Sequence, residues 1–342
     1  MRLGHWTGPL NTFVLLAGPL LLLAVLLQLV NWPIVDHIVT EAFLDLTVVV
    51  GLQIFMGNTG ILGFAHIGFM GVGAYASAIF SMTPMAKSLA LPTLYPFLAD
   101  IQLPFLLALF LGGLVAALVA AVVGIPLMRL TAFAAVITAF ALLVIIHTVL
   151  VHWTALTNGP HTLFGLDRHT YLLDSALWAT FFIAVAIGFK ESKVGLQLRA
   201  SRDDQVSASA IGVNTTTVRW MGFVLSAFVA GMGGGLWAHF ITSFSPTAFF
   251  LKMTFVVLAM LVIGGPATVS GAVIGTVVVS FAYQGLRAIE NTLNMAQLFT
   301  EPVVGLTDVC LSVALILMLI LRPLGLIERD ELRLNWSRHN GG

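Results

Sequence analysis

A few side chains that could move protons or bind a polar solute lie in, or at the edge of, long apolar runs. They are three histidines and two aspartates: His66, His147, His239, Asp45 and Asp308. Ionisable groups are costly in a membrane and often mark a function; otherwise each bonds a neighbouring helix carbonyl or lies at the interface. The sequence contains no His–Asp–His series at helical spacing, which is the pattern that would indicate a proton relay. His66 is the better functional candidate, because it alone lies in a glycine-rich segment.

Signatures of catalysis are missing from the sequence. It contains no H-E-x-x-H and no G-x-S-x-G, which argues against a zinc hydrolase or a serine hydrolase. It also lacks G-x-x-x-x-G-K-[ST], so the chain is not expected to hydrolyse ATP. The only cysteine, Cys310, excludes an intrachain disulfide and a cysteine-rich metal site. We expect no catalytic residue, no metal site and no cofactor in this chain.

Residues 57–75 concentrate six glycines and a histidine within an apolar run. Glycine lets helices approach closely, which would make this segment a tight helix–helix seam. Glycine also allows a helix to break, and broken backbone at membrane depth is tolerated only where it is buried or lines a cavity. The second interpretation predicts a discontinuous helix that lines a translocation path, with these residues on it: Asn58, Thr59, Gly60, Gly63, His66, Gly68, Gly71 and Gly73.

Residues 190–219 form the one long charged segment between apolar runs. Ser201, with Asp204 three residues later, is typical of a helix N-terminus, and Gly212 is typical of a helix end. The pattern predicts a short helix from about Arg202 to Gly212 that lies outside the membrane. A helix of about ten residues is marginal alone in water, so we expect it to dock against something. The alternative is an ordinary positively charged linker.

The elements that must position these residues are membrane spans. Of the 342 residues, 59% are hydrophobic and only 9% are charged, against about 25% charged in soluble domains. Apolar runs near twenty residues predict an all-α polytopic membrane protein of about ten helices and argue against a barrel. The second and eighth runs are short, so half or re-entrant helices are possible there. The runs are 10–30, 42–56, 60–82, 103–123, 132–151, 172–189, 220–240, 250–263, 269–286 and 303–321.

Loop charges predict the orientation, because cytoplasmic loops are rich in Lys and Arg. With a cytoplasmic N-terminus, eleven of the 15 basic residues fall on the inner side. Both termini are then cytoplasmic, and residues 1–327 form one membrane domain followed by a short cytoplasmic tail, 328–342. A net charge of zero gives no basic field for nucleic acid. The four outer basic residues are Lys87, Arg168, Lys252 and Arg287.

The order of residues in the charged loop makes a family resemblance specific. Leu198-Arg-Ala-x-Arg202-Asp-Asp-x-Val-x-Ala208-x-Ala210-x-Gly212-Val-Asn214 resembles the coupling loop of ABC importer permeases of the branched-chain amino acid class, LivM type. Five further stretches match the family in order: 51–75, Thr157-Asn-Gly159, 223–231, Ser245-Pro246 and Ile263-Gly-Gly265. Together they cover about residues 45–285.

The resemblance implies a permease subunit without its own ATPase site, in the bacterial inner membrane. Its implied partners are two ATP-binding subunits that use ATP, a second LivH-like permease subunit and an extracytoplasmic solute-binding protein. Branched-chain amino acids are the implied substrate; urea or short amides, and an ion-coupled secondary carrier, are the alternatives. The residues implied to couple the chain to the ATPase are Arg199, Arg202, Asp203, Asp204, Ala208, Ala210 and Gly212.

Overall fold

The structure is a computed structural model that describes residues 7–30, 32–295, 305–322, 325–327 and 331–332. Over these residues the chain is built from helices, and the one extended pairing is an isolated bridge between Leu163 and Phe244. The expected all-α polytopic architecture is confirmed.

Each of the ten apolar runs corresponds to one helix. The ten are α1 Thr7–Val30, α2 Pro33–Thr59, α3 His66–Ser81, α6 Phe105–Leu127, α7 Ala132–His152, α9 Leu172–Glu191, α12 Thr215–Ile241, α13 Leu251–Gly264, α14 Val269–Met295 and α15 Leu306–Leu321. The connections carry α4 Pro84–Ala90, α5 Pro96–Ala99, α8 Thr154–Thr157, α10 Lys193–Asp203, α11 Gln205–Ala210 and the 3-10 turn η2 Pro246–Phe249.

Seven of these helices are long and apolar enough to cross a membrane: α1, α2, α6, α7, α9, α12 and α14. The expectation that the second span is short is wrong, because α2 has 27 residues. Its first turns carry Asp36, Thr40 and Glu41, which break the apolar run without breaking the helix. The third span is the shorter one: α3 has 16 residues.

The eighth span, α13, has 14 residues, which is about 21 Å of helix. Lys252 Nζ, near its start, lies 3.0 Å from Asp308 Oδ2 near the start of α15. Past the end of α15, the Leu326 and Ile327 amides donate to the carbonyls of Ile263 and Gly264 at the end of α13, both at 2.9 Å. Helices α13 and α15 therefore run in the same direction, with their starts and their ends close together.

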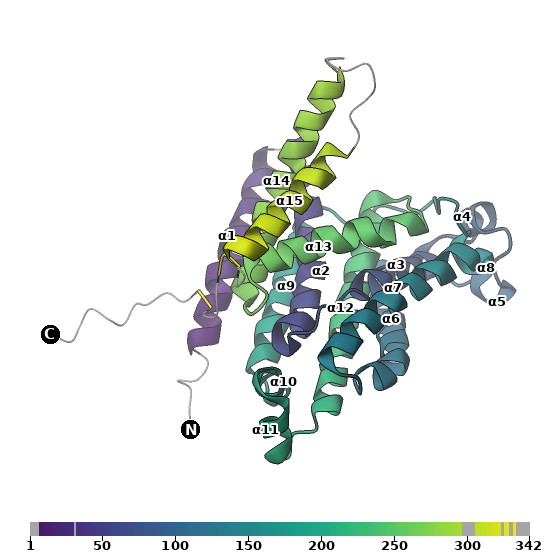
Figure 1. The fold of residues 1–342 in the computed structure, drawn as a ribbon. Coiled ribbons are helices and arrows are strands. Elements are labelled where there is room, and N and C mark those ends of the chain that lie inside the picture. The colour runs from purple at the N-terminus through teal and green to yellow at the C-terminus, as the bar shows by residue number, and fades with distance from the viewer. Residues whose placement is uncertain (1–6, 31, 296–304, 323–324, 328–330, 333–342) are drawn as a thin grey trace.

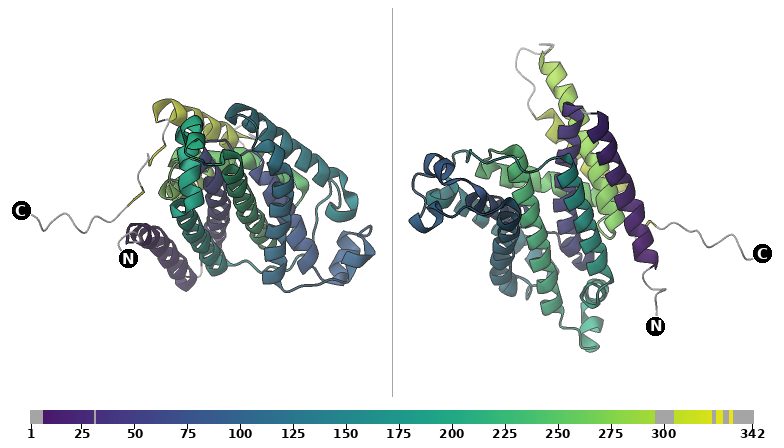
Figure 2. Two further views of the ribbon diagram at one scale, coloured as in Figure 1. Left: turned by 90° about the horizontal axis from the view of Figure 1, so that it is seen from below. Right: turned by 180° about the vertical axis from the view of Figure 1, so that it is seen from behind.

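Helices α10 and α11 project from one end of the bundle, which we call the α11 end (Figure 1). The first turns of α1, the last turn of α9 and the start of α12 lie toward the same end, as the view from behind also shows (Figure 2). Consecutive spans run in alternating directions. The charged loop and the end of α15 therefore lie on one side of the bundle, and the assignment of that side to the cytoplasm stays a prediction.

Helix α12 is the centre of the packing and contacts α2, α3 and α6. Close approach is possible because glycines face each other: a Cβ built on Gly73 would lie 2.2 Å from the Gly231 carbonyl oxygen. Likewise, a Cβ on Gly234 would lie 2.0 Å from the carbonyl oxygen of Met70. Small residues at membrane helix interfaces act in this way, through van der Waals contact between backbones.

Candidate functional site

The helix interruption lies between α2 and α3, not inside the third span. Helix α2 ends at Thr59, and Gly60 takes a left-handed φ of 72° that other residues rarely adopt. Residues 60–65 are non-helical, and α3 then runs without a break through Gly68, Gly71 and Gly73. The glycine-rich span is thus discontinuous at its beginning only. The interruption is at the α11 end, where α2 finishes.

His66 is fully enclosed at this interruption and fastens it to α12. Its Nδ1 lies 2.9 Å from the Gly63 carbonyl oxygen and its Nε2 lies 2.8 Å from the Ser226 hydroxyl. A carbonyl can only accept, so Nδ1 donates to Gly63. The Ser226 hydroxyl lies within hydrogen-bond distance of both Nε2 and the Phe223 carbonyl, at 2.8 Å from each. Phe55, Phe69 and Phe223 surround the ring. Both ring nitrogens are satisfied, which is the arrangement of a structural histidine.

The other residues expected on a translocation path lie mostly in helix seams. A Cβ on Gly68 would lie 3.0 Å from Ile146 side-chain atoms, and one on Gly71 would lie 3.0 Å from Leu150 and Phe249. Thr59 bonds its own helix through its hydroxyl. Asn58 donates from Nδ2 to the Ile54 carbonyl, but its buried Oδ1 has no partner among the described residues. The path assignment stays a prediction.

The charged loop contains two helices where one was expected. Asp204 separates them and caps α11: its Oδ1 accepts from the amides of Val206 and Ser207 at 2.8 and 3.1 Å. The Ser207 hydroxyl also donates to Oδ2, and these bonds lower the pKa of Asp204. Ser201, expected to begin the helix, lies in α10 and bonds the Leu198 carbonyl. Gly212 follows the end of α11 with a φ of 88°.

The two alanines of α11 face opposite ways. Ala208 is buried against the chain itself, at 3% exposure, so it does not offer the small outer surface that was expected of it. Ala210 is exposed, and Val206 and Ile211 are each 79% exposed. The tip of α11 therefore presents aliphatic side chains to the outside, although it belongs to the most highly charged loop.

Both arginines of α10 are engaged inside the chain. Arg202 Nη1 donates to the Gly57 carbonyl at 2.7 Å, and Arg199 Nη2 donates to the Lys190 carbonyl at 2.9 Å. Asp203 is exposed and lies 3.6 Å from the Arg202 guanidinium. Arg202 thus connects the charged loop directly to the last turn of α2, three residues before the interruption at Gly60.

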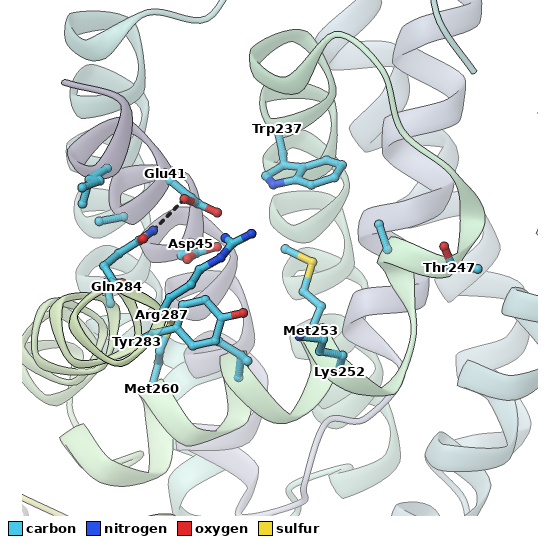
Figure 3. A pocket seen from close by; sticks show the side chains of 15 residues that line it. Glu41, Asp45, Trp237, Thr247, Lys252, Met253, Met260, Tyr283, Gln284 and Arg287 are labelled. Atoms are coloured by element: carbon cyan, nitrogen blue, oxygen red, sulfur yellow. Dashed lines mark hydrogen bonds between the residues drawn. The ribbon is translucent and has the colours of Figure 1, made fainter. Parts of the chain in front are cut away.

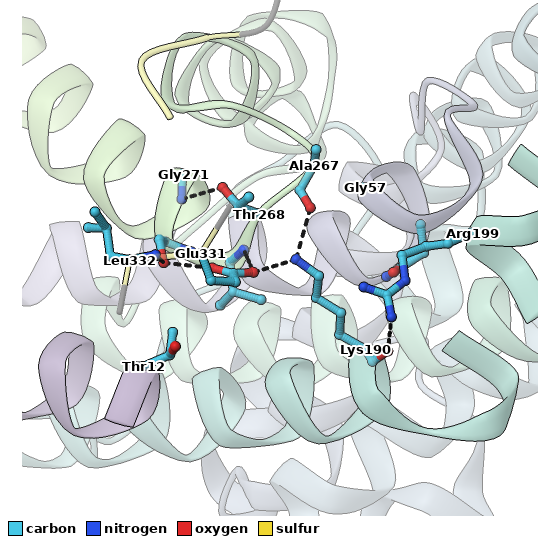
Figure 4. A network of polar contacts seen from close by, with 12 residues as sticks. Thr12, Gly57, Lys190, Arg199, Ala267, Thr268, Gly271, Glu331 and Leu332 are labelled. Carbon is cyan, nitrogen blue, oxygen red and sulfur yellow. Dashed lines mark hydrogen bonds and ion pairs between the residues drawn. The ribbon is translucent and has the colours of Figure 1, made fainter. Parts of the chain in front are cut away.

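A second polar cluster at the α11 end involves Glu331, which falls in the predicted tail (Figure 4). Lys190 Nζ lies 2.5 Å from Glu331 Oε1 and donates to the Ala267 carbonyl at 3.1 Å. Glu331 also accepts from the amides of Val269 and Ser270, at the start of α14, both at 2.9 Å. A carboxylate is favoured there by the helix dipole. Sequence reasoning missed this cluster, since 141 residues separate the ion pair.

If the charged loop contacts an ATP-binding subunit, as the family resemblance implies, replacing Arg202 with methionine is expected to weaken coupling while leaving the chain folded. Methionine keeps much of the aliphatic volume but removes the bond to Gly57, and a hydrogen bond to a charged group contributes about 1.5–3 kcal/mol. Transport per ATP hydrolysed should fall several-fold in vesicles. Arg202→Lys retains a hydrogen-bond donor and should recover part of the lost transport. Equal transport by the methionine variant and the parent would contradict a role for this contact.

A family model described as the branched-chain amino acid transport system permease component matches residues 34–321, that is, α2 through α15. The chain belongs to this family. The permease is 24% identical to the high-affinity branched-chain amino acid transport system permease protein LivM of Salmonella typhimurium, over 94% of this chain and 78% of that protein. It is 25% identical to LivM of Escherichia coli, over 92% of this chain and 76% of that protein.

The permease also resembles LivH of Escherichia coli, at 30% identity over 46% of this chain and 48% of that protein. No solved structure matches the chain. Membership in a transport-component family agrees with a multi-pass membrane protein that serves transport, and the expected family is confirmed.

Proposed function

We propose that this chain is the membrane-spanning subunit of an ABC importer for branched-chain amino acids. Solute arrives on an extracytoplasmic binding protein, and two ATP-binding subunits drive transport. A second LivH-like subunit completes the pathway. The observation that carries the proposal is the α11 tip, where Val206 and Ile211 are each 79% exposed in a charged loop. The names of the related proteins supply the solute class.

Docking of α11 on an ATP-binding subunit explains the exposed aliphatic side chains. A soluble surface gains nothing from two exposed aliphatic groups on one short helix, whereas a partner's cleft would remove them from water. Asp204 and Gly212 hold α11 in a defined orientation at its two ends. The segment is therefore already ordered before it binds, which lowers the entropic cost of docking.

The route from ATPase to membrane is short. Helix α11 follows α10 after one residue, and Arg202 of α10 bonds Gly57 in the last turn of α2. A Cβ on Gly57 would lie 2.3 Å from the Pro266 carbonyl oxygen, so the turn between α13 and α14 packs directly against the last turn of α2. We propose that displacement of α11 shifts these helix ends and the interruption at 60–65. This shift would change the positions of the proposed path residues, 58–73, at the end of the translocation path nearest α11.

Two alternatives differ in driving force or in solute. An ion-coupled carrier needs ionisable groups that bind the coupling ion. His66 and His239 are both engaged in hydrogen bonds within the bundle, so Asp45 is the carboxylate that such a mechanism would have to use. A permease for urea or short amides would share the α11 mechanism. Competition separates the solutes: isoleucine and valine should suppress uptake of labelled leucine by the assembled transporter, whereas urea and acetamide should not. Suppression by urea alone would reassign the substrate.

Orientation follows from the placement of basic residues: we propose that the α11 end and both termini are cytoplasmic. Gly342, at the predicted cytoplasmic end, lies outside the described residues. A cysteine at Gly342 or at the exposed position of Ile211, in a Cys310→Ser background, should resist a membrane-impermeant thiol reagent in intact cells. Both should react after the cells are opened. Met85→Cys, on the other side, should react in intact cells; the reverse pattern would invert the topology.

A further inference from the structure

A cavity of about 410 Å³ lies between α2, α12, α13 and α14 (Figure 3). That is within the usual range for small-molecule sites, about 300–1,000 Å³. Its residues on α2 come from the first half of that helix and its residues on α14 come from the middle and second half. Helix α2 ends, and α14 begins, at the α11 end. The cavity is therefore displaced toward the opposite side, from which a binding protein would deliver solute.

Charges of both signs line this cavity. Glu41 and Asp45 point into it from α2, and Arg287 reaches it from α14 (Figure 3). Lys252 lies at its edge on α13. Glu41 already accepts a 3.0 Å hydrogen bond from Gln284, and Lys252 is paired with Asp308. Asp45 and Arg287 make no hydrogen bond or ion pair with any described residue, so one carboxylate and one guanidinium remain available.

The remainder of the wall is mostly apolar. Ala42, Val256 and Met260 line it, together with Ile38, Met253 and the ring of Trp237. Three hydroxyl-bearing residues interrupt this surface: Thr247, Ser280 and Tyr283. Of these, Ser280 is 7% exposed, and its Oγ has no hydrogen-bond partner among the described residues. A buried hydroxyl without a partner costs free energy in the folded chain, which a bound polar group would recover.

We infer that this cavity binds the zwitterion of an aliphatic α-amino acid, as a station on the translocation route. Asp45 would receive the ammonium group, Arg287 would receive the carboxylate, and the Ile38–Val256–Met260 wall would hold the side chain. Ser280 would supply a further hydrogen bond to the polar end. Charge-assisted bonds of this type are roughly twice as strong as neutral ones. The inference rests on the proposed function and names the residues of this chain that meet the solute.

The charge arrangement discriminates between solute classes. Urea and short amides carry no net charges, so they would leave Asp45 and Arg287 unpaired in a largely apolar cavity, which is costly. An inorganic cation or anion would satisfy only one of the two. A zwitterion with an aliphatic side chain satisfies both charges and the wall together, and this is the chemistry common to leucine, isoleucine and valine.

Protection of a cysteine in the cavity tests the assignment directly. Met253→Cys, in a Cys310→Ser background, is labelled with a small thiol reagent in right-side-out vesicles that contain the assembled transporter. Excess L-leucine should slow labelling about tenfold. At the same concentration, 4-methylpentanoate, which lacks the ammonium, and isoamylamine, which lacks the carboxylate, should not. Equal labelling with and without leucine, or equal protection by all three compounds, would overturn the site.

Two charge-removing variants and a matched control complete the test. Asp45→Asn and Arg287→Gln should each abolish protection by leucine and lower its uptake about tenfold. Asp36→Asn, a carboxylate on the same helix that does not line the cavity, should leave protection unchanged. Leucine uptake measured in the same vesicles keeps the two claims distinct. Uptake without protection rejects the cavity and leaves the importer proposal, whereas absence of ATP-driven leucine uptake in the unmutated transporter rejects both.

Discussion

Ile211→Glu is expected to abolish ATP-driven uptake while the permease inserts, folds and keeps its other subunits. The side chain is 79% exposed, so the change should disturb little of the packing inside the chain. In the docked state its carboxylate would be buried without a partner, at a cost of several kcal/mol, and about 1.4 kcal/mol is already tenfold in affinity. The measurement is co-purification of the ATP-binding subunits with the permease, together with uptake in vesicles.

A matched control separates docking from a general effect of added charge. Met85→Glu alters an equally exposed side chain, at 76%, on α4 of the opposite side. It should retain the ATP-binding subunits and uptake. Val206→Glu should reproduce the loss seen with Ile211→Glu. If all three variants transport like the parent, α11 is an ordinary cytoplasmic linker.

Gly73→Leu is expected to prevent accumulation of folded permease. A Cβ at this position would already lie 2.2 Å from the backbone of Gly231, so α3 and α12 must separate before a side chain fits. Overpacking of even a flexible core typically costs about 1–3 kcal/mol, and backbone on backbone cannot relax by a rotamer change. The measurement is the amount of monodisperse permease complex after mild detergent extraction, and its midpoint of thermal unfolding.

Gly68 and Gly188 are the comparison positions for this prediction. A Cβ on Gly188 meets nothing within 4 Å, so Gly188→Leu should fold normally. One on Gly68 meets the Ile146 side chain at 3.0 Å, which can move, so Gly68→Leu should give a folded complex. If the segment 57–75 lines the path, uptake by Gly68→Leu should still fall. Full uptake by that variant would make the segment a packing seam alone, and normal folding of Gly73→Leu would contradict the seam itself.

The positions of the spans were largely predictable because lipid exposure requires long apolar runs. Hydropathy misplaced the start of a span where the helix surface packs against other helices instead of lipid. The first half of α2 carries Asp36, Thr40 and Glu41, yet it is helical; Thr40 is buried in the bundle and Glu41 lines a cavity. The interruption was expected within a glycine-rich span, but glycines along a helix serve close packing equally well. Among the glycines of residues 57–75, only Gly60 has the left-handed φ that ends a helix.

The charged loop was predictable as a loop with a helix, but the roles of its residues were not. Asp204, not Ser201, caps the helix. The local sequence fits either residue as the cap, so it could not decide between them. The contact of Arg202 with Gly57 spans 145 residues, and the Lys190–Glu331 pair spans 141. Such contacts depend on which helix ends meet, which periodicity does not encode. The cavity with charges of both signs was not predicted, because its residues come from four helices. In the sequence, each of its charged residues alone resembles one at the membrane interface.

Leucine uptake by the purified complex in liposomes tests the central claim most directly. The complex contains this permease, its LivH-like partner and the ATP-binding subunits, with ATP supplied at the α11 side and loaded binding protein at the other. We expect uptake that requires ATP and binding protein, persists when proton and sodium gradients are collapsed, and is lost with Ile211→Glu. Uptake that follows an ion gradient without ATP would contradict the assignment of this chain as an ABC importer permease.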